Sequence, residues 1–305
     1  MSVIETSGLG KQYRDIWALR DCTMAIPAGR IVALVGPNGA GKTTLLHLTV
    51  GLARATTGSV TVLGGAPAGS LWALERIAFV AQDVPLYGYL SVAEMLDLAA
   101  NMNRRFDRRR SESRLSELGI ALGHKVGKLS GGQRAQLALT IAFSRHPDLL
   151  VLDEPLSGLD PLARHDFMAS LMIAVAEDGL SVVFSSHVIS ELERVADYLV
   201  LLSGGRVQVM GEISELVAGH ATLSGPPVDA GRIAERFAVV QSQRAGRQAQ
   251  LLVRTGNGQG ALPEGWDSAE VTLEELVLAY LREPSACALP GPALVGLPSP
   301  KGTTA

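Results

Sequence analysis

The sequence predicts an α/β fold built around a parallel sheet, followed by a smaller region that mixes helices and a strand. A length of 305 residues is enough for one large domain plus something smaller. A hydrophobic fraction of 47% with 19% charged residues describes a protein with a sizeable core. In addition, four consecutive apolar residues, from Leu149 to Leu152, indicate a strand that is buried on both faces of a parallel sheet.

Composition and charge exclude several classes of protein. The net charge is -3 and the pI is about 6.1, so no basic surface argues for binding nucleic acid. The two cysteines, Cys22 and Cys287, match no metal-ligand spacing and are expected to be ordinary thiols of a reducing compartment. The N-terminus lacks the regions of a signal peptide, and no apolar run approaches the roughly 20 residues that cross a bilayer. We therefore expect a cytoplasmic protein without a membrane span of its own.

The first 35 residues are predicted to form short strands, over residues 3–6, 18–26 and 30–35. The last strand runs into a glycine-rich stretch that matches the pattern G-x-x-x-x-G-K-[ST], and a helix-like segment, Leu45 to Val50, follows it. The stretch consists of Gly36, Pro37, Asn38, Gly39, Ala40, Gly41, Lys42, Thr43 and Thr44. A strand, a glycine loop and a helix in this order predict a loop that binds the phosphates of a nucleotide.

The chemistry of this loop follows from its residue types. Glycines let backbone N–H groups approach a phosphate closely, and the positive end of the following helix faces the same anion. Lys42 would reach the β- and γ-phosphates, and the hydroxyl group of Thr43 would hold Mg²⁺. A glycine-rich turn without a ligand is the alternative, and the strand and helix on either side favour the nucleotide.

Two further residues are candidates for contact with that nucleotide. Tyr13 stands in a stretch predicted to be a polar loop, Lys11 to Asp15, and could stack on an adenine or cap the core. Gln82 follows a predicted strand at residues 77–81, and doubly wound sheets place ligand contacts at such strand ends. A solvent-facing loop residue fits the position of Gln82 equally well.

Residues 84–146 are predicted to be mainly helical. Segments with the apolar period of a helix lie at 92–102, 107–119 and 133–144. An arginine cluster from Arg104 to Arg110 could touch lipid headgroups, but a solvated helix face explains it more simply. Within this region Leu129 is followed by Ser130, Gly131, Gly132 and Gln133. The serine is a good N-cap. Two adjacent glycines weaken a helix start unless something approaches closely, which predicts a second site for an anion.

Two carboxylates follow the buried strand at Leu149–Leu152. Asp153 and Glu154 fall at its C-terminal end, on the side where the phosphate loop also opens. There Asp153 can hold Mg²⁺ through water while Glu154 polarises the attacking water, and a solvated acidic turn is the alternative. The segment from Ser157 to Asp160 comes next, and Pro161 is well placed to open a helix.

A last buried strand is predicted from Leu180 to Ser186, and His187 directly follows it. A single histidine at a strand end is usually structural. This one follows a third strand that ends on the nucleotide side, which makes His187 a candidate contact of the γ-phosphate. The other histidines have no such context and are assigned no role: His47, His124, His146, His165 and His220.

With these pieces in order, the sequence resembles the ATP-binding-cassette (ABC) ATPases from about residue 3 to residue 215. The most specific element is L-S-G-G-Q at Leu129–Gln133, which lies between the phosphate loop and the V-L-D-E-P strand. The resemblance implies a P-loop NTPase cassette at 1–215, with a RecA-like mixed-sheet core, an antiparallel β subdomain and an α-helical subdomain at about 84–146. The departures are a missing second arginine after Arg134, and Leu156 where a small or polar residue is usual.

The resemblance also implies roles for single residues. Tyr13 matches the adenine-stacking aromatic, and Gly36 to Thr44 match the Walker A loop. Gln82 matches the glutamine that senses Mg²⁺ and couples to the transmembrane partner. Leu149 to Asp153 match the Walker B strand, with Glu154 as the catalytic carboxylate. Ser157 to Asp160 match the loop that crosses to the partner subunit, and His187 matches the switch histidine. ATP and Mg²⁺ are the implied cofactors.

The family's mechanism is implied in the same way. Two cassettes close head-to-tail around two ATP molecules, so that the segment Ser130–Gln133 of one subunit covers the γ-phosphate held by Lys42 of the other. The chain has one cassette, so the second comes from another chain, identical or related. Hydrolysis at Glu154 would reopen the pair and drive a separately encoded integral membrane permease, which holds the protein at the inner face of the membrane.

A soluble ATP-driven switch that acts on ribosomes, DNA or a cluster-assembly complex is the alternative function. Ribosome-acting relatives usually carry two cassettes and a basic linker, and chromosome-type relatives carry a long coiled coil. This sequence shows neither feature. A module that binds ATP without hydrolysing it is a third possibility, and the intact Glu154 and His187 argue against it.

A small α+β accessory domain is expected over residues 216–283, with a helix at 233–237, a strand at 248–253 and an amphipathic helix at 272–281. Thr272 is the expected N-cap of that last helix, and Glu275 stands at its third position, as in a capping box. The apolar stripe of that last helix is expected to pack on its own small domain. An extension of this kind resembles exporter-type cassettes, particularly those of bacterial drug or lipid efflux. Residues 284–305 are rich in Pro, Gly, Ala and Ser and are expected to be disordered.

Overall fold

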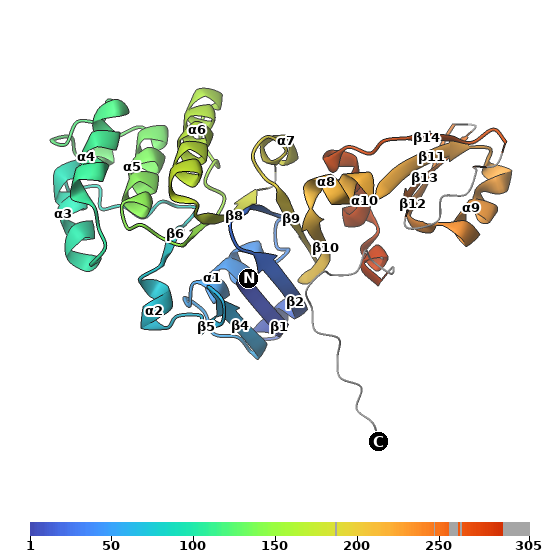
Figure 1. The fold of residues 1–305 in the computed structure, drawn as a ribbon, viewed down its shortest axis with the longest axis horizontal. Coiled ribbons are helices and arrows are strands. Elements are labelled where there is room, and N and C mark those ends of the chain that lie inside the picture. The colour runs from blue at the N-terminus through green and yellow to red at the C-terminus, as the bar shows by residue number, and fades with distance from the viewer. Residues whose placement is uncertain (187, 247, 256–261, 263, 289–305) are drawn as a thin grey trace, which may run out of the picture.

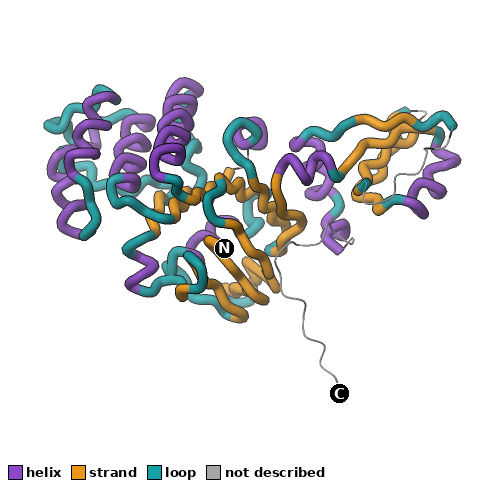
Figure 2. Tube along the Cα trace, viewed as in Figure 1, coloured by secondary structure: helices purple, strands orange, loops and turns teal. Residues whose placement is uncertain are grey.

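The computed structural model describes residues 1–186, 188–246, 248–255, 262 and 264–288 of the chain. Over these residues the chain forms a six-stranded central sheet and two four-stranded sheets. Figure 1 and Figure 2 show a group of helices at one end of the molecule and the C-terminal sheet at the other, with the central sheet between them. The α/β fold predicted from the sequence is confirmed.

The N-terminal residues form an antiparallel sheet in the order β2-β1-β4-β5. Its strands are β1 (Ser2–Tyr13), β2 (Ile16–Pro27), β4 (Thr57–Val62) and β5 (Ala66–Pro67). The polar loop predicted at Lys11–Asp15 is wrong in part, because β1 continues to Tyr13, which pairs with Ile16. Only Arg14 and Asp15 form the turn. Pairing across the hairpin satisfies the backbone groups of these polar residues, which the residue types alone do not reveal.

The central sheet has the order β10-β9-β3-β8-β7-β6. Its strands are β3 (Ile31–Val35), β6 (Ile77–Val80), β7 (Leu149–Leu152), β8 (Ser181–Ser186), β9 (Tyr198–Ser203) and β10 (Arg206–Glu212). Neighbouring strands are parallel, except that β10 runs antiparallel to β9. Every residue of β3, β7 and β8 is buried, as expected for parallel strands covered on both faces. The loops that follow β3, β6, β7 and β8 therefore meet at one edge of the sheet.

Helices lie on both faces of this sheet and in a group beside it. They are α1 (Lys42–Thr49), α2 (Leu71–Leu74), α3 (Val92–Met102), α4 (Arg108–Glu117), α5 (Gly131–Phe143), α6 (Pro161–Asp178) and α7 (Ile189–Leu192), with a 3₁₀ turn η1 (Val126–Lys128). Val151 and Val183 pack in one apolar cluster with residues of α1 and the first sheet. Their neighbours Leu150 and Phe184 point to the other face and pack with residues of α5 and α6. The alternation follows from the two-residue period of a strand.

The three helices predicted within residues 84–146 are present as α3, α4 and α5, and Figure 1 places them together at one end of the molecule. Helix α5 begins at Gly131, two residues earlier than predicted. The reason is a capping box, in which Ser130 and Gln133 bond each other's backbone N–H groups and hold the first turn. The limits of the helical subdomain stay a proposal.

The C-terminal residues add a second antiparallel sheet in the order β12-β13-β11-β14. The elements are α8 (Ile213–Ala218), β11 (His220–Gly225), η2 (Pro227–Asp229), α9 (Ala230–Arg236), β12 (Ala238–Ala245), β13 (Gln248–Arg254), β14 (Asp267–Ala269), α10 (Leu273–Arg282) and η3 (Pro284–Ala288). The face of this sheet that carries Leu223 and Leu251 packs with Ile233 of α9 and with Trp266.

Helix α10 begins at the predicted N-cap, Thr272, which forms a capping box with Glu275. The prediction that its apolar stripe packs only on its own small domain is incomplete. Leu276 and Val277 belong to one buried cluster with Leu199 of the central sheet, and α10 contacts α7 and α8 as well as β12. The amphipathic pattern shows that one face is buried but does not show against what.

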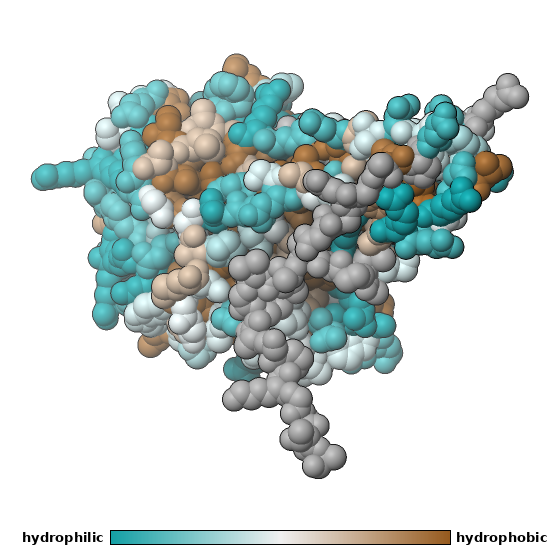
Figure 3. All heavy atoms as spheres, turned by 45° about the vertical axis from the view of Figure 1, so that its right-hand side comes forward, coloured by the Kyte–Doolittle hydropathy of each residue, from teal (hydrophilic) through white to brown (hydrophobic). Residues whose placement is uncertain are grey.

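Residues 284–288 correct another expectation. They form the 3₁₀ turn η3, and Ala286 is buried, so the predicted disordered tail does not begin at 284. The remainder of that predicted tail lies outside the described residues. Among the residues that are described, no helix combines the length and the apolar character needed to cross a membrane. Figure 3 shows hydrophilic residues over much of one face, with hydrophobic residues gathered near its upper edge.

Candidate active site

The loop between β3 and α1 is shaped by three glycines. Gly39 has a φ of 80° and Gly41, the N-cap of α1, has a φ of 104°, both in the left-handed region that favours glycine. A Cβ atom on Gly36 would lie 2.3 Å from the carbonyl oxygen of Leu202, so only glycine fits there. The loop thus directs the first N–H groups of α1, which have no partner within the helix, to the open edge of the sheet.

Lys42, the first residue of α1, joins this loop to the end of β7. Its side chain is 5% exposed. The Nζ atom donates to the carbonyl oxygens of Gly36 at 2.7 Å and Pro37 at 3.3 Å, and it lies 3.6 Å from Oε1 of Glu154. A buried ammonium group requires partners of this kind. The fold therefore brings together the lysine and the carboxylate that the sequence singled out.

A cavity of about 630 Å³ opens beside the loop, which is a size that suits a nucleotide. The lining residues are Tyr13, Ala18, Asn38, Gly39, Ala40, Gly41, Lys42, Thr43, Thr44, Gln82, Glu154 and Ser157. Tyr13 is 47% exposed at this cavity and does not cap the core. Gln82 also lines the cavity. Ala18 was not among the predicted site residues, and Ser157 was predicted only as part of the loop that crosses to the partner subunit.

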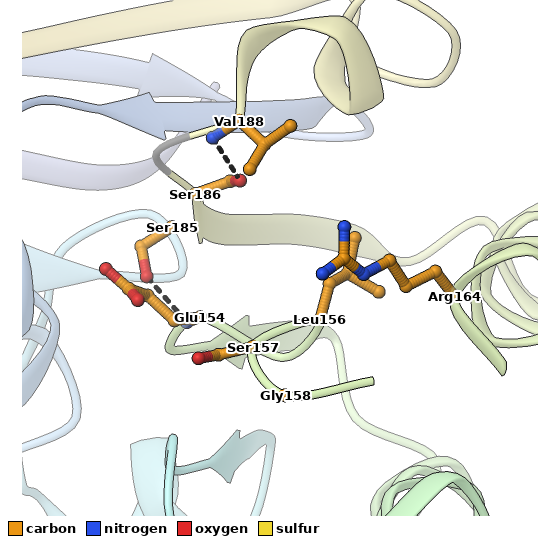
Figure 4. A pocket seen from close by; sticks show the side chains of 8 residues that line it. All are labelled: Glu154, Leu156, Ser157, Gly158, Arg164, Ser185, Ser186 and Val188. Atoms are coloured by element: carbon orange, nitrogen blue, oxygen red, sulfur yellow. Dashed lines mark hydrogen bonds between the residues drawn. The ribbon is translucent and has the colours of Figure 1, made fainter. Parts of the chain in front are cut away.

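Asp153 and Glu154 share one hydrogen-bond partner, Ser185. Asp153 is 2% exposed, and its Oδ1 accepts a hydrogen bond from the Ser185 hydroxyl at 2.7 Å. The oxygen of the same hydroxyl accepts the backbone N–H of Glu154 at 2.8 Å, and Figure 4 shows this bond. Glu154 has a φ of 44°, which few residues other than glycine adopt. Ser185 was not a predicted site residue; the available signal was a hydroxyl near the end of a buried strand.

A smaller cavity of about 80 Å³ adjoins the first and shares Glu154 and Ser157 with it. Figure 4 shows its lining, which also includes Ser185, Ser186 and Arg164 of α6. Both the carboxylate-bearing turn after β7 and the end of β8 are therefore accessible to small molecules such as water.

The segment Ser130–Gln133 does not line the larger cavity. Ser130 and Gly131 are exposed at the start of α5, and a Cβ atom added to Gly131 would meet nothing within 4 Å. By contrast, a Cβ atom on Gly132 would lie 2.8 Å from the Cβ atom of Ala163 in α6. The packing of α5 on α6 is by itself a reason for a glycine at Gly132, and the predicted anion contact of this segment stays a prediction.

Asp160 likewise does not line the larger cavity. It is the N-cap of α6, and its Oδ1 accepts the N–H of Ala163 at 2.9 Å. Pro161 is the first residue of α6, as predicted. His187 lies outside the described residues, so its predicted contact with the γ-phosphate stays a prediction.

The side chains predicted to hold Mg²⁺ all offer oxygen atoms, which are the ligands that this ion prefers. Thr43 and Gln82 line the larger cavity, and Asp153 immediately precedes Glu154, which also does. Within the described part of the chain, no group of three or more His, Cys, Asp or Glu residues could hold a metal ion. In nucleotide sites Mg²⁺ usually takes only one or two oxygens from carboxylates and the others from phosphates and water. The residues therefore fit Mg²⁺ bound together with a nucleotide.

Comparison with known proteins defines the class. A family profile described as "ABC transporter" matches residues 19–157. The ABC transporter ATP-binding protein all4389 of Nostoc sp. is 33% identical over 235 residues, which are 72% of this chain and 70% of that protein. The chain belongs to the family of ABC transporter ATP-binding proteins.

Named relatives act in both directions of transport. The Nod factor export ATP-binding protein I of Cupriavidus pinatubonensis is 34% identical over 225 residues, covering 71% of this chain and 68% of the relative. The sulfate/thiosulfate import ATP-binding protein CysA of Synechococcus elongatus is 32% identical over 225 residues, covering 72% of this chain and 65% of the relative. Sequence similarity alone therefore does not separate export from import.

Solved structures agree with the family. The ATP-binding subunit of an ABC transporter superposes with a TM-score of 0.63 and 29% identity, covering 71% of this chain and 92% of that one. The dimeric cassette MJ0796 in a post-hydrolysis state with ADP and Pi gives a TM-score of 0.62 and 26% identity. The match covers 68% of this chain and 98% of that one. The predicted P-loop cassette fold is confirmed, and the protein is an ATP-binding, ATP-hydrolysing cassette.

Proposed function

We propose that this protein is the ATPase subunit of an exporter, in which two cassettes close head-to-tail on ATP and drive a separately encoded membrane permease. The division of the site carries the head-to-tail closure in this proposal. The larger cavity contains the phosphate loop and Glu154, whereas the exposed start of α5 at Ser130 and Gly131 lies outside it. In a twofold pair the α5 start of each chain would complete the cavity of the other. The partner is a second copy or a related chain.

The main functional residues in and beside the cavity then have proposed roles. Lys42 and the N–H groups at the start of α1 bind the β- and γ-phosphates, and Tyr13 stacks on the adenine. Glu154 is the general base that polarises the attacking water. Mg²⁺, when bound, would neutralise charge on the phosphate oxygens, and Thr43, Gln82 and Asp153 would hold it.

Exposed apolar residues close to Gln82 support the permease partner. Tyr87 and Tyr89 follow Gln82 in the chain and are 52% and 72% exposed. Large exposed apolar side chains that gather next to a nucleotide-sensing loop fit a docking surface for another protein. The protein would then lie on the inner face of the membrane through its permease.

Labelling of mixed dimers tests the head-to-tail arrangement. A wild-type chain is paired with a Ser130→Ala chain of different mass, and a photoreactive ATP analogue reports which chain holds nucleotide. We expect labelling of the wild-type chain to fall, because its site borrows Ser130 from the partner. Ser91→Ala is the matched control, since Ser91 forms the same capping box with Glu94 at the start of α3. A loss confined to the variant chain's own site would contradict the arrangement.

Purification from native membranes tests the partner. We expect the chain to bring a polytopic membrane protein with it, and recovery of ribosomes or chromosomal complexes instead would favour the soluble switch. The direction can be measured on the recovered complex in liposomes with ATP added only outside. A compound that stimulates ATP hydrolysis should accumulate in the lumen, because outward-facing cassettes of an exporter move it away from their own side. Depletion from the lumen would indicate import.

A further inference from the structure

We propose that Ser185 is a positioning residue for ATP hydrolysis, whose single hydroxyl group holds both the side chain of Asp153 and the backbone of Glu154. The inference rests on the roles proposed above for Asp153 and Glu154. It adds a residue from β8 to a site whose carboxylates come from the end of β7.

The strand register places this hydroxyl. Strands β7 and β8 are parallel neighbours, with Leu152 beside Phe184, so the next residues, Asp153 and Ser185, also lie side by side. Val151 and Val183 point toward α1, and two residues further on Asp153 and Ser185 share that face, on which the phosphate loop lies. Ser185 is buried in the wall of the smaller cavity, and the protein supplies both groups that its hydroxyl bonds.

The two hydrogen bonds use the hydroxyl fully. Ser185 Oγ donates to Oδ1 of Asp153 at 2.7 Å and accepts the N–H of Glu154 at 2.8 Å. One O–H donor and its acceptor lone pairs serve both bonds at once. The bond to Oδ1 fixes the rotation of the Asp153 carboxylate and does not occupy its other oxygen. A donor that orients a metal-side carboxylate in this way usually matters nearly as much as the ligand.

The bond to Glu154 acts on the backbone. A non-glycine residue at a φ of 44° keeps this conformation only when its surroundings hold it. Ser185 supplies a partner for the N–H of Glu154, and Figure 4 shows its side chain directed at this residue. Without the hydroxyl, this backbone loses one of the bonds that hold it, and we expect the Glu154 carboxylate to move away from Lys42. One substitution should therefore affect both the cation site and the general base.

Ser181 provides a matched control on the same strand. It is also buried, and its hydroxyl also accepts a backbone N–H, that of Gly29, at 2.9 Å. It lies at the opposite end of β8, away from the cavity. Ser185→Ala and Ser181→Ala thus each remove one buried hydroxyl group from the same strand. Only Ser185→Ala takes a hydrogen-bond partner away from Asp153 and Glu154.

The test measures turnover and cation binding separately. For Ser185→Ala we expect kcat to fall about 10- to 100-fold with a KM for ATP within about threefold of wild type. The Mn²⁺ concentration that half-saturates the complex of protein and ADP, followed by electron paramagnetic resonance, should rise about 10-fold. Binding of a fluorescent ATP analogue in EDTA should stay within about twofold, because the phosphate loop is untouched. Ser181→Ala should match the wild type in all three measurements.

Three results would overturn the proposal. They are a Ser185→Ala protein with unchanged kcat and Mn²⁺ affinity, an equal loss in Ser181→Ala, or loss of nucleotide binding in EDTA, which would mean that Ser185 merely stabilises the fold. Glu154→Gln in the same assays distinguishes a failure of this inference about Ser185 from a failure of the proposed function. If Glu154→Gln retains turnover, the role of Glu154 fails; if it loses turnover while Ser185→Ala does not, only the inference fails.

Discussion

A Cβ atom on Gly132 would lie 2.8 Å from the Cβ atom of Ala163, so α5 and α6 approach as closely as a glycine permits. Gly131, its neighbour, has nothing within 4 Å of an added Cβ atom. The two neighbouring glycines at the start of α5 therefore have different structural roles. Gly132 serves the packing of this chain, and Gly131 presents open backbone to whatever docks on the helix start.

Substitution by alanine should separate the two glycines. Gly132→Ala should lower the free energy of unfolding by about 1–3 kcal/mol relative to Gly131→Ala, because the added methyl group overpacks the contact between α5 and α6. Urea unfolding of both variants measures this difference. Gly131→Ala should unfold like the wild type and instead weaken ATP-dependent dimerisation. Equal stability of the two variants would contradict the packing role of Gly132.

Removing the proposed general base should stop hydrolysis while nucleotide still binds. Glu154→Gln keeps the size of the side chain and should lower the rate of ATP hydrolysis about 10²- to 10⁴-fold. Because ATP is then retained, the variant should also dimerise stably, which size-exclusion chromatography with ATP would show. Turnover at the wild-type rate would reject the role assigned to Glu154.

Lys42 should matter for binding itself. Lys42→Ala removes charge-assisted hydrogen bonds to phosphate and should weaken ATP binding about 10- to 100-fold. Titration with a fluorescent ATP analogue measures this affinity. Lys125→Ala is a suitable control, because Lys125 is half-exposed and pairs with Glu94 away from the cavity. An unchanged affinity in Lys42→Ala would argue against the proposed phosphate contact.

A buried polar group ties the C-terminal sheet to α8 and α10. His220 has one ring nitrogen 2.6 Å from the carbonyl oxygen of Leu216 and the other 2.9 Å from the hydroxyl of Tyr280, which also accepts a hydrogen bond from Nε of Arg254 at 2.7 Å. A neutral imidazole satisfies this arrangement, with the Tyr280 hydroxyl donating to it. Burial, aided by the charge of Arg254, lowers the pKa of His220 from its usual 6.5.

The lowered pKa of His220 makes the stability of this region depend on pH. Below pH 6.5 the unfolded chain binds a proton at His220 that the folded chain does not, so stability should fall as the pH drops from 6.5 toward the folded pKa. Thermal unfolding measured between pH 8 and about pH 5 tests this. His220→Gln should flatten the pH dependence, whereas His124→Gln, at an exposed position, should leave it as in the wild type. An unchanged profile in His220→Gln would contradict the assignment.

Much of the local structure was predictable. The apolar run of β7, the N-cap Ser130, the helix-opening Pro161 and the capping box of α10 are signals that act within a few residues, and all appear where expected. The errors occur where distant segments meet. Tyr13 lies in a strand because β2 pairs with it, and α10 packs on α7 and α8 because the chain turns back toward the cassette.

The sequence by itself determined the kind of chemistry, because a glycine loop, a lysine and paired carboxylates carry their reactivity wherever they are placed. Only the tertiary structure decided which of them meet. The approach of Lys42 to Glu154, the bridge of Ser185 between Asp153 and Glu154, and the absence of the α5 start from the cavity depend on strand order and register. These are long-range pairings that no local pattern of side chains specifies.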